Sequence, residues 1–167
     1  MELLDIKIRK AIPDDAEIIS QIWEVICAER IYSAVSTPFT AKQEREYISS
    51  LSEREGIFVA EFNNRVVGFM SLDLWSKVID SFNHVCTIGT FILPEWRGKE
   101  ISYVLANHTF EFAEAHDYDK IVIYVRKGNE RGIKFYQNLG FFIKGELEHQ
   151  VLIDDEYENE VFMEKFI

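Results

Sequence analysis

The residues best suited to chemistry lie in one segment, residues 91–102, which reads FILPEWRGKEIS. An apolar run ends at Pro94, a turn with Arg97 and Lys99 follows, and a long amphipathic pattern begins at Gly98. The first amide groups of a helix lack intrahelical partners and lie at the positive end of its dipole. Phosphate groups bind readily there, and basic side chains strengthen the attraction. The segment therefore predicts an anion-binding turn.

A second informative segment, residues 129–141, reads NERGIKFYQNLGF. It has a short helical pattern that ends at Gly140, because glycine commonly terminates helices. A basic turn alone is more often an ordinary solvated connection, and Tyr136 alone would more often be an amphipathic core residue. The two segments in this order, within one chain, carry more weight than either does separately.

Together the two segments resemble the GNAT superfamily of acyl-CoA-dependent N-acyltransferases, and the resemblance spans essentially the whole chain. The family's cofactor motif has Arg or Gln, two variable residues, Gly, one variable residue, and then Gly or Ala. Arg97 opens this motif, whereas Glu100 and Ser102 occupy its two small-residue positions. The closing segment 160–166, EVFMEKF, is also similar to the end of many members.

The resemblance implies that acetyl-CoA is the co-substrate. It places backbone contacts to the pantetheine arm on the strand before the motif, with an amide near Ile92 polarising the thioester carbonyl. It places the pyrophosphate at the amides of residues 98–102. The cofactor-binding residues implied in this way are Phe91, Ile92, Leu93, Arg97, Gly98, Lys99, Glu100, Ile101, Ser102, Asn129 and Tyr136.

The activity implied by the resemblance is direct transfer of an acetyl group, in a ternary complex, to a primary amine of a small molecule or peptide. Tyr136 matches the catalytic tyrosine that protonates the departing thiolate. A phenol with a pKa near 10 donating to a thiolate with a pKa near 8.5 is uphill by roughly 2 kcal/mol. The pocket must therefore assist the transfer.

The general base is open at this stage. An alkyl amine is mostly protonated at neutral pH, so it must lose a proton before it attacks. Many relatives carry a glutamate on the strand that here contains Cys86 and Thr87, and this chain has none there. His84, Asp73 and a water relay remain as alternatives. The apolar setting of Cys86 favours a packing role over a nucleophilic one.

Glu100 is the main departure from the motif because it places a carboxylate near a site for an anion. Two like charges ~5 Å apart repel by about 3 kcal/mol at an effective dielectric constant near 20. The side chain can turn into water, so we expect weakened but not abolished CoA binding. The alternative function is a non-catalytic acyl-CoA-binding or regulatory domain. Transfer of a longer acyl chain, or of an acyl group from a carrier protein, is a third hypothesis.

The charge of the chain limits its partners. With 29 acidic and 18 basic residues the net charge is −11, so neither nucleic acid nor an anionic membrane is expected as a partner. A cationic amine is a mild preference for the acceptor. In the family, substrate contacts come from the first two helices and the last hairpin. Aromatic and acidic residues in those regions are Trp23, Tyr32, Phe39, Glu44, Glu148, Asp154 and Asp155. Many relatives form homodimers, and the sequence does not fix the oligomeric state.

The two cysteines, Cys27 and Cys86, are far apart in apolar surroundings, as expected for free thiols in a reducing compartment. The first ten residues lack the apolar core of a signal peptide, and no apolar run is long enough to span a membrane. We therefore expect a soluble, cytoplasmic protein. The scattered histidines give no metal-ligand spacing, so no metal is expected.

The chain of 167 residues has no linker that would divide it, so we predict one domain over residues 1–167. Apolar residues at helical spacing over residues 18–26 predict a first helix, capped by Asp14 or Asp15. Further helices are predicted at residues 40–51, 98–116 and 130–139. Strands are predicted at residues 6–9, 57–62, 66–74, 84–93, 121–125, 141–153 and 157–166. The run at 121–125 is continuously apolar, which predicts a central strand covered on both faces. The order indicates an α/β (α+β type) fold: a single mixed, mostly antiparallel twisted sheet of about 6–7 strands flanked by about four helices.

Overall fold

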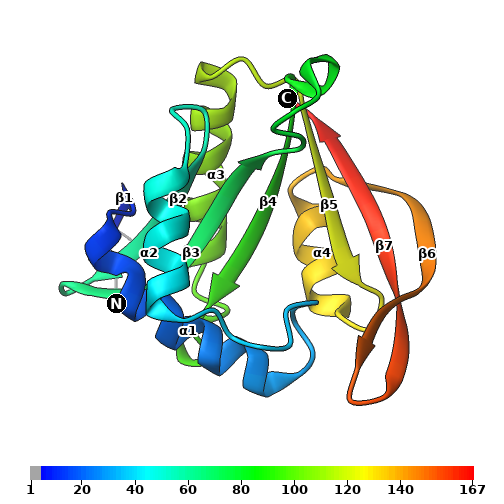
Figure 1. Cartoon of the computed structure of the whole chain (residues 1–167), viewed down its shortest axis with the longest axis horizontal. Helices are drawn as coiled ribbons and strands as arrows, with labels where there is room; N and C mark the ends of the chain where they lie inside the picture. Colours follow the sequence, from blue (N-terminus) through cyan, green and yellow to red (C-terminus); the bar gives the residue numbers. More distant parts are fainter. Residues whose placement is uncertain (1–4) are drawn as a thin grey trace.

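A single seven-stranded sheet organises the computed structural model, which describes residues 5–167. The strand order is β1-β2-β3-β4-β5-β7-β6 (Figure 1). The strands are β1 (Ile6–Lys10), β2 (Gly56–Phe62), β3 (Arg65–Leu74), β4 (Val85–Ile92), β5 (Lys120–Arg126), β6 (Phe142–Ile153) and β7 (Glu156–Phe166). The α-helices of the described residues are α1 (Ala16–Glu29), α2 (Ala41–Ser50), α3 (Ile101–Ala115) and α4 (Glu130–Asn138). Residues 1–4 of the predicted domain lie outside the described residues.

Helices cover both faces of the first half of the sheet, because alternate side chains of β2 and β3 belong to two different cores. Phe58 and Met70 lie in the same buried cluster as Leu105 of α3. Val59 and Phe69 lie in a second cluster, which includes the α1 residues Ile22 and Trp23. Burial on both faces explains why these two strands read as continuous apolar runs.

The sheet opens between β4 and β5, the only parallel pair among the strands of residues 5–167. These strands pair at Val85–Lys120 and Cys86–Ile121 and then separate. Figure 1 shows them meeting at one end and diverging toward the other, with α4 near the opening. By contrast, β4 pairs with β3 as far as Ile92, and β5 pairs with β7 along its whole length. Each strand at the opening is therefore held in place from its outer side.

The opening exposes backbone groups of β4. The amide of Leu93 donates to the carbonyl of Val67 at 3.0 Å. In an antiparallel ladder successive residues point their polar groups to opposite sides, so the N–H and C=O of Ile92 point away from β3. The end of β4 thus presents a free strand edge toward β5.

One expectation about β5 was wrong. The run at residues 121–125 was predicted to be covered on both faces, but only Ile121, Ile123 and Val125 are buried, and Tyr124 is 44% exposed. Because β5 separates from β4, the helix α1, which packs on β3 and β4, does not cover this face of β5. The apolar run reflects one buried face and one face that borders the opening.

Gly68 of β3 positions the free end of β4. A Cβ at this residue would lie 2.5 Å from Cδ1 of Ile92 and 2.9 Å from the carbonyl oxygen of Phe91. We expect Gly68→Ala to lower the free energy of unfolding by about 1–3 kcal/mol, because the strand must shift to relieve the overlap. Urea denaturation measures this change.

The matched control is Gly56→Ala on β2, where the nearest atoms are Cε of Lys10 and Cζ of Phe58, both at 3.1 Å. Its loss of stability should be clearly smaller. Equal losses for the two variants would contradict the close approach of β4 to Gly68.

Candidate active site

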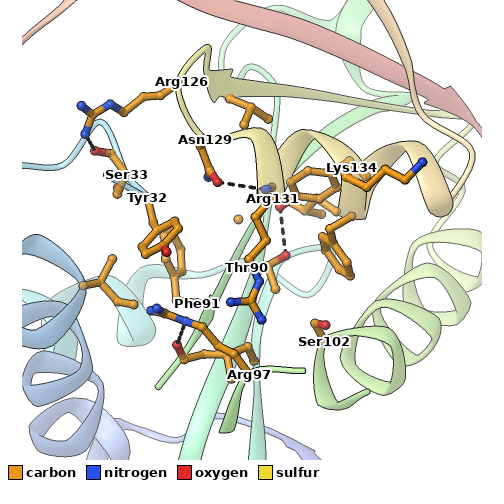
Figure 2. Close-up of a pocket in the computed structure, with 18 of the residues that line it drawn as sticks. Tyr32, Ser33, Thr90, Phe91, Arg97, Ser102, Arg126, Asn129, Arg131 and Lys134 are labelled. Carbon is orange, nitrogen blue, oxygen red and sulfur yellow. Dashed lines mark hydrogen bonds between the residues drawn. The ribbon is translucent and has the colours of Figure 1, made fainter. Parts of the chain in front are cut away.

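A pocket of about 720 Å³ lies at the opening between β4 and β5 (Figure 2). This volume is within the ~300–1,000 Å³ typical of small-molecule sites. The predicted site residues that line it are Phe91, Ile92, Arg97, Gly98, Glu100, Ile101, Ser102, Asn129 and Tyr136. Two others lie elsewhere: Leu93 is buried in the core beside α1, and Nζ of exposed Lys99 lies 4.9 Å from the ring centroid of Trp96.

The predicted anion-binding turn is formed by residues 98–102. Helix α3 begins at Ile101, later than the predicted residue 98, because Gly98 and Glu100 have left-handed φ values of 72° and 62°. The amides of Tyr103 and Val104 donate to the carbonyl of Glu100. Within residues 5–167, the amides of residues 98–102 have no recorded acceptor. This run of free N–H groups at a helix N-terminus is suited to an anion.

Glu100 differs from the family pattern in its backbone as well as its charge. A left-handed conformation costs a non-glycine residue about 1–2 kcal/mol, and Glu100 adopts it at the start of α3. Glu100 is exposed, so its carboxylate has access to water. The glycine of the family motif would meet the same φ without strain.

Arg97 reaches the pocket, but its guanidinium is already paired. Its two terminal nitrogens donate to the carboxylate of Glu29 at 2.7 and 2.6 Å, and Nε donates to the carbonyl of Ile92 at 3.0 Å. The guanidinium also lies 4.5 Å from the ring centroid of Tyr32. These contacts join the end of β4 to α1. A contribution of the Arg97 charge to cofactor binding stays a prediction.

Two basic residues of α4 were missed by the sequence reasoning. Arg131 and Lys134 line the pocket and have no acidic partner within 4.0 Å among the described residues. A Cβ on Gly98 would lie 3.8 Å from a terminal nitrogen of Arg131. Figure 2 shows the Arg131 side chain extending from α4 toward the segment of Arg97, whereas Lys134 points outward. The available signal was a pair of basic residues three positions apart in the first turns of α4.

Asn129 fixes the start of α4. Its side-chain oxygen accepts a hydrogen bond from the amide of Gly132 at 2.9 Å, so it is the N-cap of the helix. A Cβ on Gly132 would lie 2.5 Å from Nδ2 of Asn129. Asn129 also lines the pocket and is 9% exposed. Its predicted contact with the cofactor stays a prediction.

Tyr136 places a buried hydroxyl at the free edge of β4. Its oxygen lies 2.9 Å from Oγ1 of Thr90, and either hydroxyl can donate. Burial raises the pKa of Tyr136 to about 12, although hydrogen bonding by Thr90 opposes the shift. Tyr136 is therefore a neutral phenol at any working pH and retains its proton as a donor.

The predicted bases do not line this pocket. Asp73 accepts a hydrogen bond from the hydroxyl of Tyr47, and His84 is exposed at the entry to β4. Burial raises the pKa of the Cys86 thiol to about 12, so this cysteine stays protonated and is a poor nucleophile. A water relay remains open.

Of the residues predicted to contact the acceptor, Tyr32 lines the main pocket. Asp154 lines a second pocket of about 380 Å³ near the β6–β7 turn. Trp23 and Glu44 are only 7% and 4% exposed, Trp23 packs against Phe39, and none of these three residues lines either pocket.

Neither a membrane-spanning helix nor a cluster of metal-ligating side chains occurs within residues 5–167. No helix within residues 5–167 is both long and apolar enough to cross a membrane. The same residues contain no group of three or more His, Cys, Asp or Glu side chains that could hold a metal ion.

Comparison with known proteins supports the resemblance. The model of the acetyltransferase (GNAT) family matches residues 20–141. An uncharacterized N-acetyltransferase of Methanocaldococcus jannaschii is 32% identical over 103 residues, which are 60% of this chain and 46% of that protein. The spermidine N(1)-acetyltransferase of Escherichia coli strain K12 is 30% identical over 122 residues, which are 71% of this chain and 61% of that protein. The chain thus spans less than two thirds of either relative.

A solved structure with the same fold is that of a GNAT superfamily phosphinothricin acetyltransferase from Sinorhizobium meliloti in complex with acetyl-CoA. It matches with a TM-score of 0.89 at 16% identity, over 98% of this chain and 89% of that one. The predicted family and the predicted fold class, a mixed and mostly antiparallel sheet with flanking helices, are both confirmed.

Two variants separate the effect of the Glu100 charge on acetyl-CoA binding from the effect of its backbone conformation on stability. Removing the carboxylate in Glu100→Gln should tighten acetyl-CoA binding about two- to fivefold, as expected for an exposed like-charge contact. Glu100→Gly should do the same and also raise the free energy of unfolding by about 1 kcal/mol, because it relieves the left-handed strain. Calorimetry and urea denaturation measure the two effects.

If Glu100→Gln binds acetyl-CoA no more tightly than the wild type, the carboxylate does not oppose the anion. If Glu100→Gly gives no gain in stability over Glu100→Gln, the backbone is not strained there.

Proposed function

Because the chain belongs to the acetyltransferase (GNAT) family, we propose that it is an acetyl-CoA-dependent N-acetyltransferase. It transfers the acetyl group to a primary amine of a small molecule or peptide, by direct attack in a ternary complex. The observation that carries this proposal is one pocket that combines the free amides of residues 98–102, the free edge of β4 and the hydroxyl of Tyr136. The proposed domain spans residues 1–167.

The residues of the pocket fit acetyl-CoA. The amides of residues 98–102 would bind the pyrophosphate, and Arg131 and Lys134 would supply the positive charge that Arg97 shares with Glu29. The free N–H of Ile92 would donate to the carbonyl oxygen of the acetyl group. A fixed donor aimed at a developing oxyanion contributes about 3–4 kcal/mol in other enzymes. When bound, the co-substrate supplies the acetyl group as an activated thioester.

Tyr136 would protonate the sulfur as the C–S bond breaks. With a pKa of about 12, its phenol is a weaker acid than free tyrosine. Complete proton transfer to an ordinary thiolate would be uphill by about 5 kcal/mol. Tyr136 therefore gives its proton to sulfur only as its oxygen receives another from the amine nitrogen, and Thr90 keeps the hydroxyl in place.

A cationic amine is the proposed acceptor class. The net charge of −11 favours the approach of cations, and the E. coli relative is named for spermidine, which carries primary amines. Spermidine is therefore the first probe, with other primary amines beside it. Assembly as a homodimer and a cytoplasmic location stay predictions, and light scattering tests the former.

The alternative is a non-catalytic acyl-CoA-binding domain, which the strained and acidic Glu100 favours. Acetyl-CoA binding without thiol release on any amine would support that alternative. Turnover with a primary amine would exclude it.

Replacing Tyr136 tests the catalytic assignment. We expect Tyr136→Phe to lower kcat by about 10²–10⁴-fold, as typical for the loss of an acid catalyst, while the acetyl-CoA Kd changes little. Thiol release, followed with a chromogenic disulfide reagent, measures kcat, and calorimetry measures the Kd. Tyr118→Phe is the matched control, because it removes another buried hydroxyl, one that donates to the carbonyl of Arg54 outside the pocket. Similar losses of kcat in both variants would contradict a specific role of Tyr136.

The two arginines at the pocket should have different roles. Arg131→Gln should weaken acetyl-CoA binding about fivefold, the effect of an exposed charge contact worth ~1 kcal/mol, with unchanged stability. Arg97→Gln should destabilise the fold by about 1–3 kcal/mol, because it leaves the Glu29 carboxylate and the Ile92 carbonyl without their donor. Calorimetry and urea denaturation of both variants test this, and the reverse pattern would refute it.

A further inference from the structure

Glu160 of β7 is a buried carboxylate for which the reaction described above has no use. It lines the main pocket and is only 8% exposed. Within residues 5–167 its side chain makes no hydrogen bond or ion pair. Its neighbours on the same strand differ: Glu158 accepts from Arg126, and Glu164 pairs with Lys120 at 2.7 Å. Glu160 is therefore an acid without a partner at the wall of a ligand pocket.

The guanidinium of Arg126 lies near Glu160 but makes its hydrogen bonds to other groups. Arg126 of β5 lies directly opposite Glu160 in the β5–β7 ladder. Its Nε donates to Glu158, and one terminal nitrogen donates to the carbonyls of Arg30 at 2.7 Å and Ser33 at 3.1 Å. Figure 2 shows this side chain directed toward Ser33, in the loop after α1. Arg126 thus connects that loop to β5 and makes no ion pair with Glu160.

A largely buried carboxylate without a hydrogen-bond donor is unfavourable, because burial removes part of its hydration without replacing it. Burial raises the pKa of Glu160, Arg126 opposes the shift, and Glu158 adds to it. A ligand with a positive charge and N–H donors would compensate this cost. An alkylammonium group has both.

The surroundings of Glu160 also suit an ammonium ion. Tyr124 lies two residues before Arg126 on β5, hence on the same face as Glu160, and it lines the pocket together with Tyr32. Aromatic faces attract cations. The residue of β6 that pairs with Glu160 is Leu147, which is uncharged. The ionisable groups beside Glu160 on this face of the sheet are thus Arg126 and Tyr124 of β5 and Glu158 of β7, and Tyr32 of the loop after α1 lines the same pocket.

We propose that Glu160 binds the ammonium group of the acceptor and is the general base that removes its proton. This inference rests on the proposed function. It assigns the general base to Glu160, because the earlier candidates His84 and Asp73 do not line the pocket. Thr90 and Tyr136 line the same pocket from β4 and α4, so one cavity holds the base, the strand edge and the acid.

The proton and electron changes balance in three parts. First, an N–H bond of the ammonium breaks and an O–H bond forms on Glu160. Next, the lone pair of the amine nitrogen forms the N–C bond to the acetyl carbon, and the electron pair of the C–S bond goes to sulfur. Finally, sulfur takes the proton of Tyr136, and Tyr136 regains one from the nitrogen, while the proton on Glu160 leaves to water.

A raised carboxyl pKa has a defined consequence for the pH profile. The base is active only when ionised, so kcat/KM of the wild type should rise as the pH increases through the pKa of Glu160 and then level off. Without this carboxylate the enzyme can use only those amine molecules that are already deprotonated in solution. The rise of kcat/KM should then continue toward the pKa of the amine, near 10.

The test compares Glu160→Gln, Glu160→Asp and the control Glu156→Gln in the full chain. Glu156 is an exposed acid at the start of the same strand and lies outside the main pocket. One measurement is the binding of spermidine and of butylamine by calorimetry, with desulfo-CoA present to prevent turnover. The other is the pH profile of kcat/KM with acetyl-CoA. Thermal unfolding checks that each variant folds.

We expect Glu160→Gln to weaken amine binding about tenfold and to lower kcat/KM at neutral pH by about 10²–10⁴-fold. The loss should diminish as the pH approaches the pKa of the amine. Affinity for acetyl-CoA should stay unchanged, Glu160→Asp should recover part of the activity, and Glu156→Gln should match the wild type.

Turnover by Glu160→Gln with the wild-type pH profile would overturn the assignment of the base. Binding of both amines unaffected by Glu160→Gln, or absent in the wild type, would overturn the ammonium site. A wild type that binds amines through Glu160 but releases no thiol would instead contradict the proposed function, so the two failures are distinguishable.

Discussion

The separation of β4 from β5 is the constraint on which the site depends. After two paired residues these strands diverge, and each is held by its outer neighbour, β4 by β3 and β5 by β7. The divergence leaves the N–H of Ile92 without a strand partner and gives space for a pocket. A sheet closed at this point would satisfy the backbone internally and leave no edge for a ligand.

The charged residues around the opening divide into structural pairs and free groups. Arg97 joins the end of β4 to α1 through Glu29, and Arg126 joins β5 to the loop after α1. These contacts hold both rims of the opening. Among the described residues, the charged groups of the pocket without an ion-pair partner include Arg131 and Lys134 of α4, on the side of the anion-binding turn, and Glu160 of β7. The pocket therefore has a basic part suited to phosphates and an acidic part suited to an amine.

Glu100 illustrates a conflict between local structure and ligand binding. The turn at residues 98–102 has a left-handed backbone at two positions, and Gly98 adopts this conformation without strain. Glu100 adopts the same conformation at a cost and adds a negative charge. Its exposure to water limits the electrostatic part of that cost.

The sequence by itself determined the family, the order of the elements and most residues of the pocket. Apolar periodicity places the helices and strands close to their observed bounds, because core burial repeats with the period of each element. The tertiary structure alone decided which charges are free. Arg97 was predicted to bind the cofactor, but Glu29 pairs with it. Glu160 was only part of the closing segment in the sequence, but it is buried at the pocket. Pairing and burial depend on residues distant in the chain, so no local pattern reports them.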